Sequence, residues 1–175
     1  QLVGEPVWVK VGYSVTYYPY NTTIHHADFA RESGLLLPLE KLEIKEVVSD
    51  AVPKSPGQRQ IMAVFAKEGK SYAFPIGAAQ ADDYRFFIND MLFIEDPHTL
   101  YTHWPADVWN AIDNHQVKLG MNELQADFAI GLGVAESGGD DAQKTMEDAN
   151  GRNPLRITYV HGKISDIKGG APGAH

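Results

Sequence analysis

The stretch that decides the fold is residues 60–76, which read QIMAVFAKEGKSYAFPI. Two apolar runs, Gln60–Ala66 and Lys70–Ile76, flank Lys67-Glu68-Gly69, where the glycine suits the positive φ of a hairpin loop. Upstream, Lys41–Val48 alternates charged and apolar residues, which is typical of a half-buried antiparallel strand. Strands spaced this closely predict a small, strongly curved β-barrel or sandwich over residues 1–78.

A different pattern follows Gly77. The apolar and aromatic run Ala81–Ile94 fits either a short helix or a strand, and we favour the helix. Trp104-Pro105 predicts the start of a helix, because a proline in the first turn lacks only an N–H that would have no partner there. Asn122 and Gln125 have the spacing of a capping box and predict the start of a second helix.

Short strands are expected after this second helix, at residues 143–149, 155–160 and 163–168. The sequence therefore predicts an α+β protein. A β-rich part covers residues 1–78, a linking segment covers 79–104, and a helix–helix–three-stranded antiparallel meander covers 105–168. Residues 169–175, rich in glycine, alanine and proline, are expected to form a disordered tail.

The composition excludes several classes of function. The 175 residues include 15 Lys and Arg against 23 Asp and Glu, a net charge of −8, which argues against a partner made of nucleic acid. The absence of cysteine excludes disulfides, thiolate zinc sites and a cysteine nucleophile. No apolar run approaches the roughly 18–20 residues of a membrane-spanning helix, so we expect no transmembrane segment.

Residues 105–168 resemble a known family. The pattern Gly120-Met121-Asn122-x-x-Gln125, the helix-closing Gly131-x-Gly133 and the later run 156–164 are similar to the SmpA/OmlA (BamE-like) module and to β-lactamase-inhibitor-protein repeats. The departures are Asn122 for the usual Ser or Thr, Tyr159 for the usual Phe, and the missing lipoprotein cysteine. Residues 1–78 resemble a bacterial SH3-like barrel more loosely.

The resemblance implies an exported, non-enzymatic cell-envelope protein that acts as a protein–protein interaction or assembly module. We therefore expect a protein partner and no cofactor, while the oligomeric state stays open. Gln1 fits a mature N-terminus left after removal of a signal peptide, which predicts a periplasmic or secreted protein; an N-terminus trimmed for expression is the alternative. The expected interaction surface comprises Trp8, Tyr13, Tyr17, Glu136, Asp140, Asp141 and Tyr159.

Two other functions stay open. The tyrosine-rich strands around Tyr13 and Tyr17 have the composition of a small-ligand or glycan binding site. His98 and His103, which follow Glu95 and Asp96, are weak candidates for the metal ligands of a metal-assisted hydrolase. Their spacing matches no standard metal motif, so we predict no metal site and assign no catalytic residue.

Overall fold

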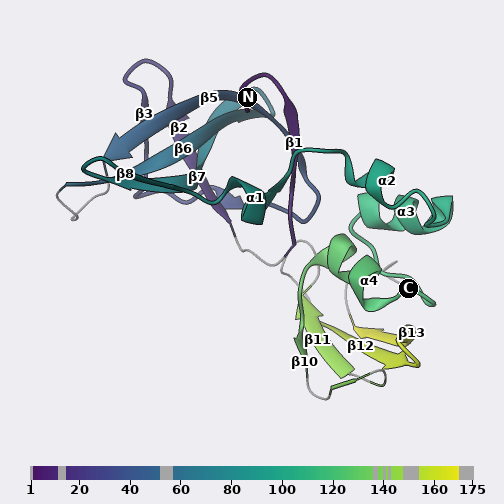
Figure 1. Ribbon diagram of the computed structural model, residues 1–175. Coiled ribbons are helices and arrows are strands. Elements are labelled where there is room, and N and C mark those ends of the chain that lie inside the picture. Colours follow the sequence, from purple (N-terminus) through teal and green to yellow (C-terminus); the bar gives the residue numbers. More distant parts are fainter. Residues whose placement is uncertain are drawn as a thin grey trace. The chain divides into compact units, whose positions relative to one another are not determined.

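The computed structural model describes residues 2–11, 15–51, 57–135, 138–139, 141, 143–147 and 154–169. These residues form thirteen strands and four helices. They fall into two compact units, the first made of residues 1–36 and 40–96 and the second of residues 37–39 and 97–175 (Figure 1). The candidate site lies in the second unit.

The described residues of the first unit form an antiparallel sheet of nine strands, in the order β3-β2-β7-β6-β5-β1-β9, with β4 paired to β2 and β8 paired to β7. Its centre is a meander of long hairpins in which every strand pairs with its neighbour in the chain. The strands are β1 Pro6–Val9, β2 Thr16–Asn21, β3 His26–Ala27, β4 Gly34–Leu35, β5 Lys41–Ala51, β6 Gln58–Lys67, β7 Lys70–Gln80, β8 Asp83–Phe86 and β9 Leu92–Phe93. One helical turn, α1 Ile88–Met91, connects β8 to β9.

The predicted hairpin at residues 60–76 is confirmed. Glu68 and Gly69 join β6 to β7 as a two-residue turn, with φ of 52° and 77°. Two-residue hairpin turns need positive φ at their central residues to match the twist of the strands, and glycine adopts that conformation without strain.

Both faces of β6 are buried, which explains why its sequence is apolar without alternation. Ile61, Ala63 and Phe65 join one core cluster, together with Phe74 of β7. Because successive side chains of a strand point to opposite faces, Met62 and Val64 join a second cluster, which also contains Tyr20 and Ala27. Strand β5 alternates as predicted, with Leu42 and Ile44 at 5% and 0% exposure between exposed charged residues.

The described residues of the second unit form three helices and a four-stranded antiparallel sheet. The helices are α2 Pro97–Leu100, α3 Ala106–Asp113 and α4 Glu123–Ile130; the strands are β10 Val134–Ala135, β11 Gln143–Glu147, β12 Pro154–Val160 and β13 Lys163–Gly169, paired in chain order. Within the described part of the chain, no helix combines the length and the apolar character that a membrane crossing needs.

The capping box predicted for α4 is confirmed. The Asn122 side chain accepts a hydrogen bond from the Gln125 backbone N–H at 2.8 Å, and the Gln125 side chain accepts one from the Asn122 N–H at 3.0 Å. The helix predicted to begin at Trp104-Pro105 is present as α3, and Pro105 is its N-cap, one position before the first turn in which the sequence placed it.

The predicted α+β class is wrong. The described chain is mostly β, and its four helices have eight residues or fewer. The expected SH3-like barrel of residues 1–78 is instead part of a larger nine-stranded sheet that continues to Phe93. The expected helix–helix–three-stranded meander has short helices and a fourth strand, because Val134 and Ala135 pair with β11.

The helix favoured for Ala81–Ile94 accounts for much of this difference. Asp83–Phe86 pairs with β7, and Leu92–Phe93 pairs with Trp8 and Val9 of β1, so only one helical turn remains between them. A short apolar run forms a strand where a neighbouring strand offers its backbone groups as hydrogen-bond partners. The tertiary structure determines whether such a strand lies beside it.

Candidate functional site

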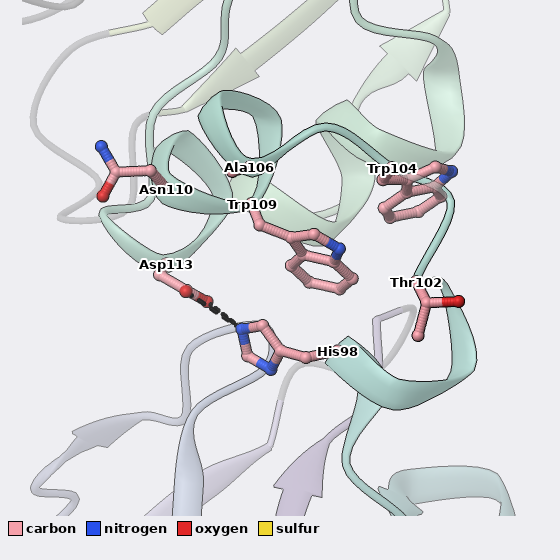
Figure 2. Close-up of a pocket in the computed structure, with 7 residues that line it drawn as sticks. All are labelled: His98, Thr102, Trp104, Ala106, Trp109, Asn110 and Asp113. Atoms are coloured by element: carbon pink, nitrogen blue, oxygen red, sulfur yellow. Dashed lines mark hydrogen bonds and ion pairs between the residues drawn. The ribbon is translucent and has the colours of Figure 1, made fainter.

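An open hollow of about 610 Å³ lies in the second unit, over α2, α3 and the turn between them. Its lining residues are His98, Thr102, Trp104, Ala106, Trp109, Asn110 and Asp113. Figure 2 shows that His98 comes from α2 and reaches toward Asp113 at the end of α3, with the Trp109 ring beside them.

His98 and Asp113 form the polar part of this hollow. Nε2 of His98 lies 2.9 Å from Oδ1 and 3.0 Å from Oδ2 of Asp113. Because an ionised carboxylate only accepts hydrogen bonds, this geometry places a proton on Nε2. The side chains are 39% and 49% exposed, respectively, so the pair remains open to solvent and to a ligand.

Aromatic rings form the apolar wall and hold the pair in place. The His98 ring packs against the Trp109 ring with centroids 4.3 Å apart, and Trp109 lies 5.2 Å from Trp104. Tyr101 stacks on Trp104 at 4.5 Å, and its carbonyl accepts a hydrogen bond from Nε1 of Trp109 at 3.1 Å. This hydrogen bond holds the Trp109 indole in its orientation.

The arrangement suits binding of a cationic or hydrogen-bonding group. A carboxylate offers about four lone-pair positions, and His98 occupies only some of them, so Asp113 can accept further donors. Trp104 and Trp109 are each only 8% exposed, so the Asp113 carboxylate and not a ring face is the group that attracts a cation. Among the lining residues, the hydroxyl of Thr102 points away from His98, so it is not placed as a nucleophile for that base (Figure 2).

The two histidines named as weak metal candidates have different surroundings. His98 pairs with Asp113, whereas the His103 ring lies 6.4 Å from the Tyr101 ring and 6.1 Å from the Trp104 ring. The described residues contain no group of three or more His, Cys, Asp or Glu side chains arranged to hold a metal ion. His25 approaches Glu46, and His26 approaches Asp50.

The predicted contact residues of the first unit lie in or beside its core. Trp8 is 7% exposed, with Lys41 above its ring at 5.7 Å. Tyr17 packs edge-on against Phe65 at 5.7 Å and against Tyr72 at 5.1 Å. Tyr13 lies outside the described residues.

The predicted contact residues of the second unit are Glu136, Asp140, Asp141 and Tyr159, and the structure describes two of them. Tyr159 is 2% exposed and lies in the core of the unit. Asp141 is exposed, and its Oδ1 accepts a hydrogen bond from the backbone N–H of His161 at 3.1 Å. Glu136 and Asp140 lie outside the described residues.

A buried polar cluster between α4 and the sheet has no counterpart in the sequence predictions. Asp127 and Tyr159 are 7% and 2% exposed, and neither Oδ1 of Asp127 nor the Tyr159 hydroxyl has a hydrogen-bond partner among the described residues. Lys144 forms an ion pair with Glu123 nearby. Burial raises the pKa of the Asp127 carboxyl from 3.8 to about 6, although Lys144 opposes this shift. Burial also raises the pKa of the Tyr159 hydroxyl, and the charge of Asp127 adds to that increase.

Of the seven lining residues, sequence reasoning named only His98 as a candidate, and it missed the partner of His98, which is Asp113. The signal available was its position four residues after Trp109, since residues four apart lie on one face of a helix. Nothing local indicates that His98, on a separate helical turn, would face that position.

Comparisons of the chain with protein-family models, with curated proteins and with solved structures find no significant match. The resemblance of residues 105–168 to the SmpA/OmlA module therefore stays a prediction.

Proposed function

We propose that this chain is a non-enzymatic protein-binding module whose second unit receives a basic side chain of a partner protein in the hollow. The observation that carries the proposal is the half-exposed Asp113 carboxylate beside the aromatic wall of Trp109 and Trp104. An arginine or lysine placed there would meet the Asp113 carboxylate beside the small exposed part of the two rings.

Two features of the chain favour a protein partner over a small molecule. The hollow is open, whereas sites for small molecules usually enclose most of the ligand surface. The net charge of −8 gives the whole chain a field that attracts basic partners and speeds their encounter. An envelope location and a role in assembly belong to the same proposal, and the resemblance noted for residues 105–168 supports them.

The proposal is tested with defined peptides and NMR. Gly-Gly-X-Gly-Gly peptides with X as Arg, Lys, Gln or Glu are titrated into the full chain, and the Trp109 indole N–H and the α3 amides are followed. We expect the Arg and Lys peptides to shift these signals and the Glu peptide to leave them unchanged. Asp113→Asn should weaken Arg-peptide binding by about tenfold, because it removes a charge-assisted hydrogen bond.

Asp166→Asn is the matched control for the loss of one carboxylate. Asp166 lies in the same unit and is 50% exposed, against 49% for Asp113. If both variants weakened Arg-peptide binding equally, the cause would be the loss of one negative charge and not the position of Asp113. Equal shifts from all four peptides would contradict the proposed docking point.

A further inference from the structure

Strand β8 is an exposed edge of the first unit's sheet. In the described part of the chain it pairs with β7 and with no other strand. All four of its residues are exposed, with Tyr84 at 60% and Phe86 at 55%, and Phe87 follows at 42%. Aromatic side chains on a free sheet edge are unusual in a monomer, since such an edge readily pairs with another strand.

The backbone of β8 alternates between its two sides. The N–H of Phe87 donates to the carbonyl of Ile76 at 2.8 Å, one step beyond the Gly77–Phe86 pair of the ladder. In an antiparallel ladder every second residue faces the same neighbour, so Arg85 and Asp83 also direct their backbone groups to β7. Tyr84 and Phe86 therefore direct their N–H and C=O groups to the free edge.

The side chains of β8 sort onto two faces. Tyr84 and Phe86 share one face, while Asp83 and Arg85 share the other and lie 3.6 Å apart as an ion pair. The charged side chains are 69% and 75% exposed, so both are available to another molecule. The strand thus carries one negative and one positive charge at positions symmetric about Tyr84.

We propose that β8 pairs antiparallel with β8 of a second copy of this chain, with the twofold axis at Tyr84. This register sets each Asp83 opposite Arg85 of the second copy and stacks the two Tyr84 rings on the axis. It also joins the two outward-facing Tyr84 backbones by a pair of hydrogen bonds, as an antiparallel ladder requires.

Charge selects this register over its neighbour. A twofold axis at Arg85 would place the two arginines directly opposite each other, and like charges in that position are destabilising. With the axis at Tyr84, both cross-strand charge pairs are attractive and the two Tyr84 rings lie opposite each other. Because a four-residue strand buries far less surface than the roughly 1,200–2,000 Å² of a standard interface, we expect a weak, concentration-dependent dimer.

Sedimentation velocity of the full chain over a concentration series tests the dimer, and charge exchange tests its register. Arg85→Glu alone and Asp83→Arg alone each place like charges opposite each other at two positions. Each should weaken the dimer by about tenfold, from the loss of two cross-strand pairs. Asp83→Arg combined with Arg85→Asp should restore it, because the exchanged charges are again complementary.

Mixing the two single variants is the most specific test of the register. The Arg85→Glu copy is then acidic at both positions and the Asp83→Arg copy is basic at both, so a heterodimer regains both attractive pairs. Asp90→Arg, an exposed change outside β8, is the control and should leave the dimer unaffected. A chain that stays monomeric at every concentration would overturn the proposal, and so would a dimer that neither single variant weakens or that the mixture fails to restore.

Discussion

At the scale of single residues, Asp127 stands out because it lies buried with an oxygen that has no partner among the described residues. Leaving a carboxylate in such a place is costly, since burial removes water and no described donor replaces it at Oδ1. The folded protein reduces that cost by holding a proton on Asp127, which is why the pKa of this group rises to about 6.

The pH dependence of stability follows from this shift. The folded state binds the Asp127 proton up to about pH 6, whereas the unfolded chain releases it near the ordinary pKa of 3.8. Stability that Asp127 contributes in its protonated form is therefore present below about pH 4 and is lost as the pH rises to 6. Asp127→Asn cannot ionise, so its free energy of unfolding relative to the natural chain should increase between pH 4 and pH 7.

Urea unfolding at pH 4, 5, 6 and 7 measures this difference. Asp166→Asn, which removes an exposed carboxylate of the same unit, serves as the control. A constant difference between the Asp127→Asn variant and the natural chain across this range would contradict the assignment. Lys144, Glu123 and Tyr159 are the other titratable groups that act on this site.

At the scale of elements, short-range signals predicted well where the cause is local. The capping box of α4 and the hairpin turn with its positive-φ Gly69 each depend on residues within a few positions, and both are present, although the predicted loop also included Lys67, which belongs to β6. Strands β8 and β9 depend on partners far away in the chain, and the apolar residues of Ala81–Ile94 carry no signal that names those partners.

Gly77 is the residue that allows β8 to approach β7. A Cβ at this position would lie 2.4 Å from the Arg85 carbonyl oxygen, which is closer than real side chains come to backbone. Gly77→Ala should therefore displace β8 and destabilise the first unit by roughly 1–3 kcal/mol, in the range of other overpacking changes. Hydrogen exchange of the β8 amides together with urea unfolding measures both effects.

Gly138→Ala is the comparison variant for this change. A Cβ at Gly138 has no atom within 4 Å, and Gly138 has no positive φ, so alanine should be tolerated there. If the Gly77→Ala variant kept the stability of the natural chain and the slow hydrogen exchange of its β8 amides, then the close approach of β8 to β7 would not require glycine at position 77.

At the scale of the whole molecule, each compact unit has buried residues of its own. The first unit packs Ile44, Phe65 and Phe74 in its main cluster, and the second buries Ile112, Ile157 and Tyr159. Units with separate cores often unfold as separate steps, because one core can be lost while the other stays folded.

Tryptophan fluorescence can follow the two units independently. Trp8 is buried in the first unit, while Trp104 and Trp109 are buried in the second. We expect a Trp8→Phe variant and a Trp104→Phe, Trp109→Phe variant to report different urea midpoints, because each keeps the probe of one unit only. Circular dichroism of both variants shows whether the substitutions themselves preserve the fold. A single shared midpoint would mean that the units unfold as one.

The candidate site was only partly predictable. His98 is visible in the sequence as a histidine near acidic residues, but its predicted companion was His103 and its observed one is Asp113. The contact between His98 and Asp113 depends on how two separate helical segments pack. The spacing of residues along the chain does not predict that packing.

The sequence by itself determined the acidic charge, the absence of thiol chemistry, the central hairpin and the helix caps, because each follows from composition or from residues close together in the chain. Only the tertiary structure decided that residues 83–86 and 92–93 are strands, that His98 meets Asp113, and that Asp127 is buried beside Tyr159. These outcomes depend on which distant segments exclude water from one another and share backbone hydrogen bonds, and that choice is made by the fold as a whole.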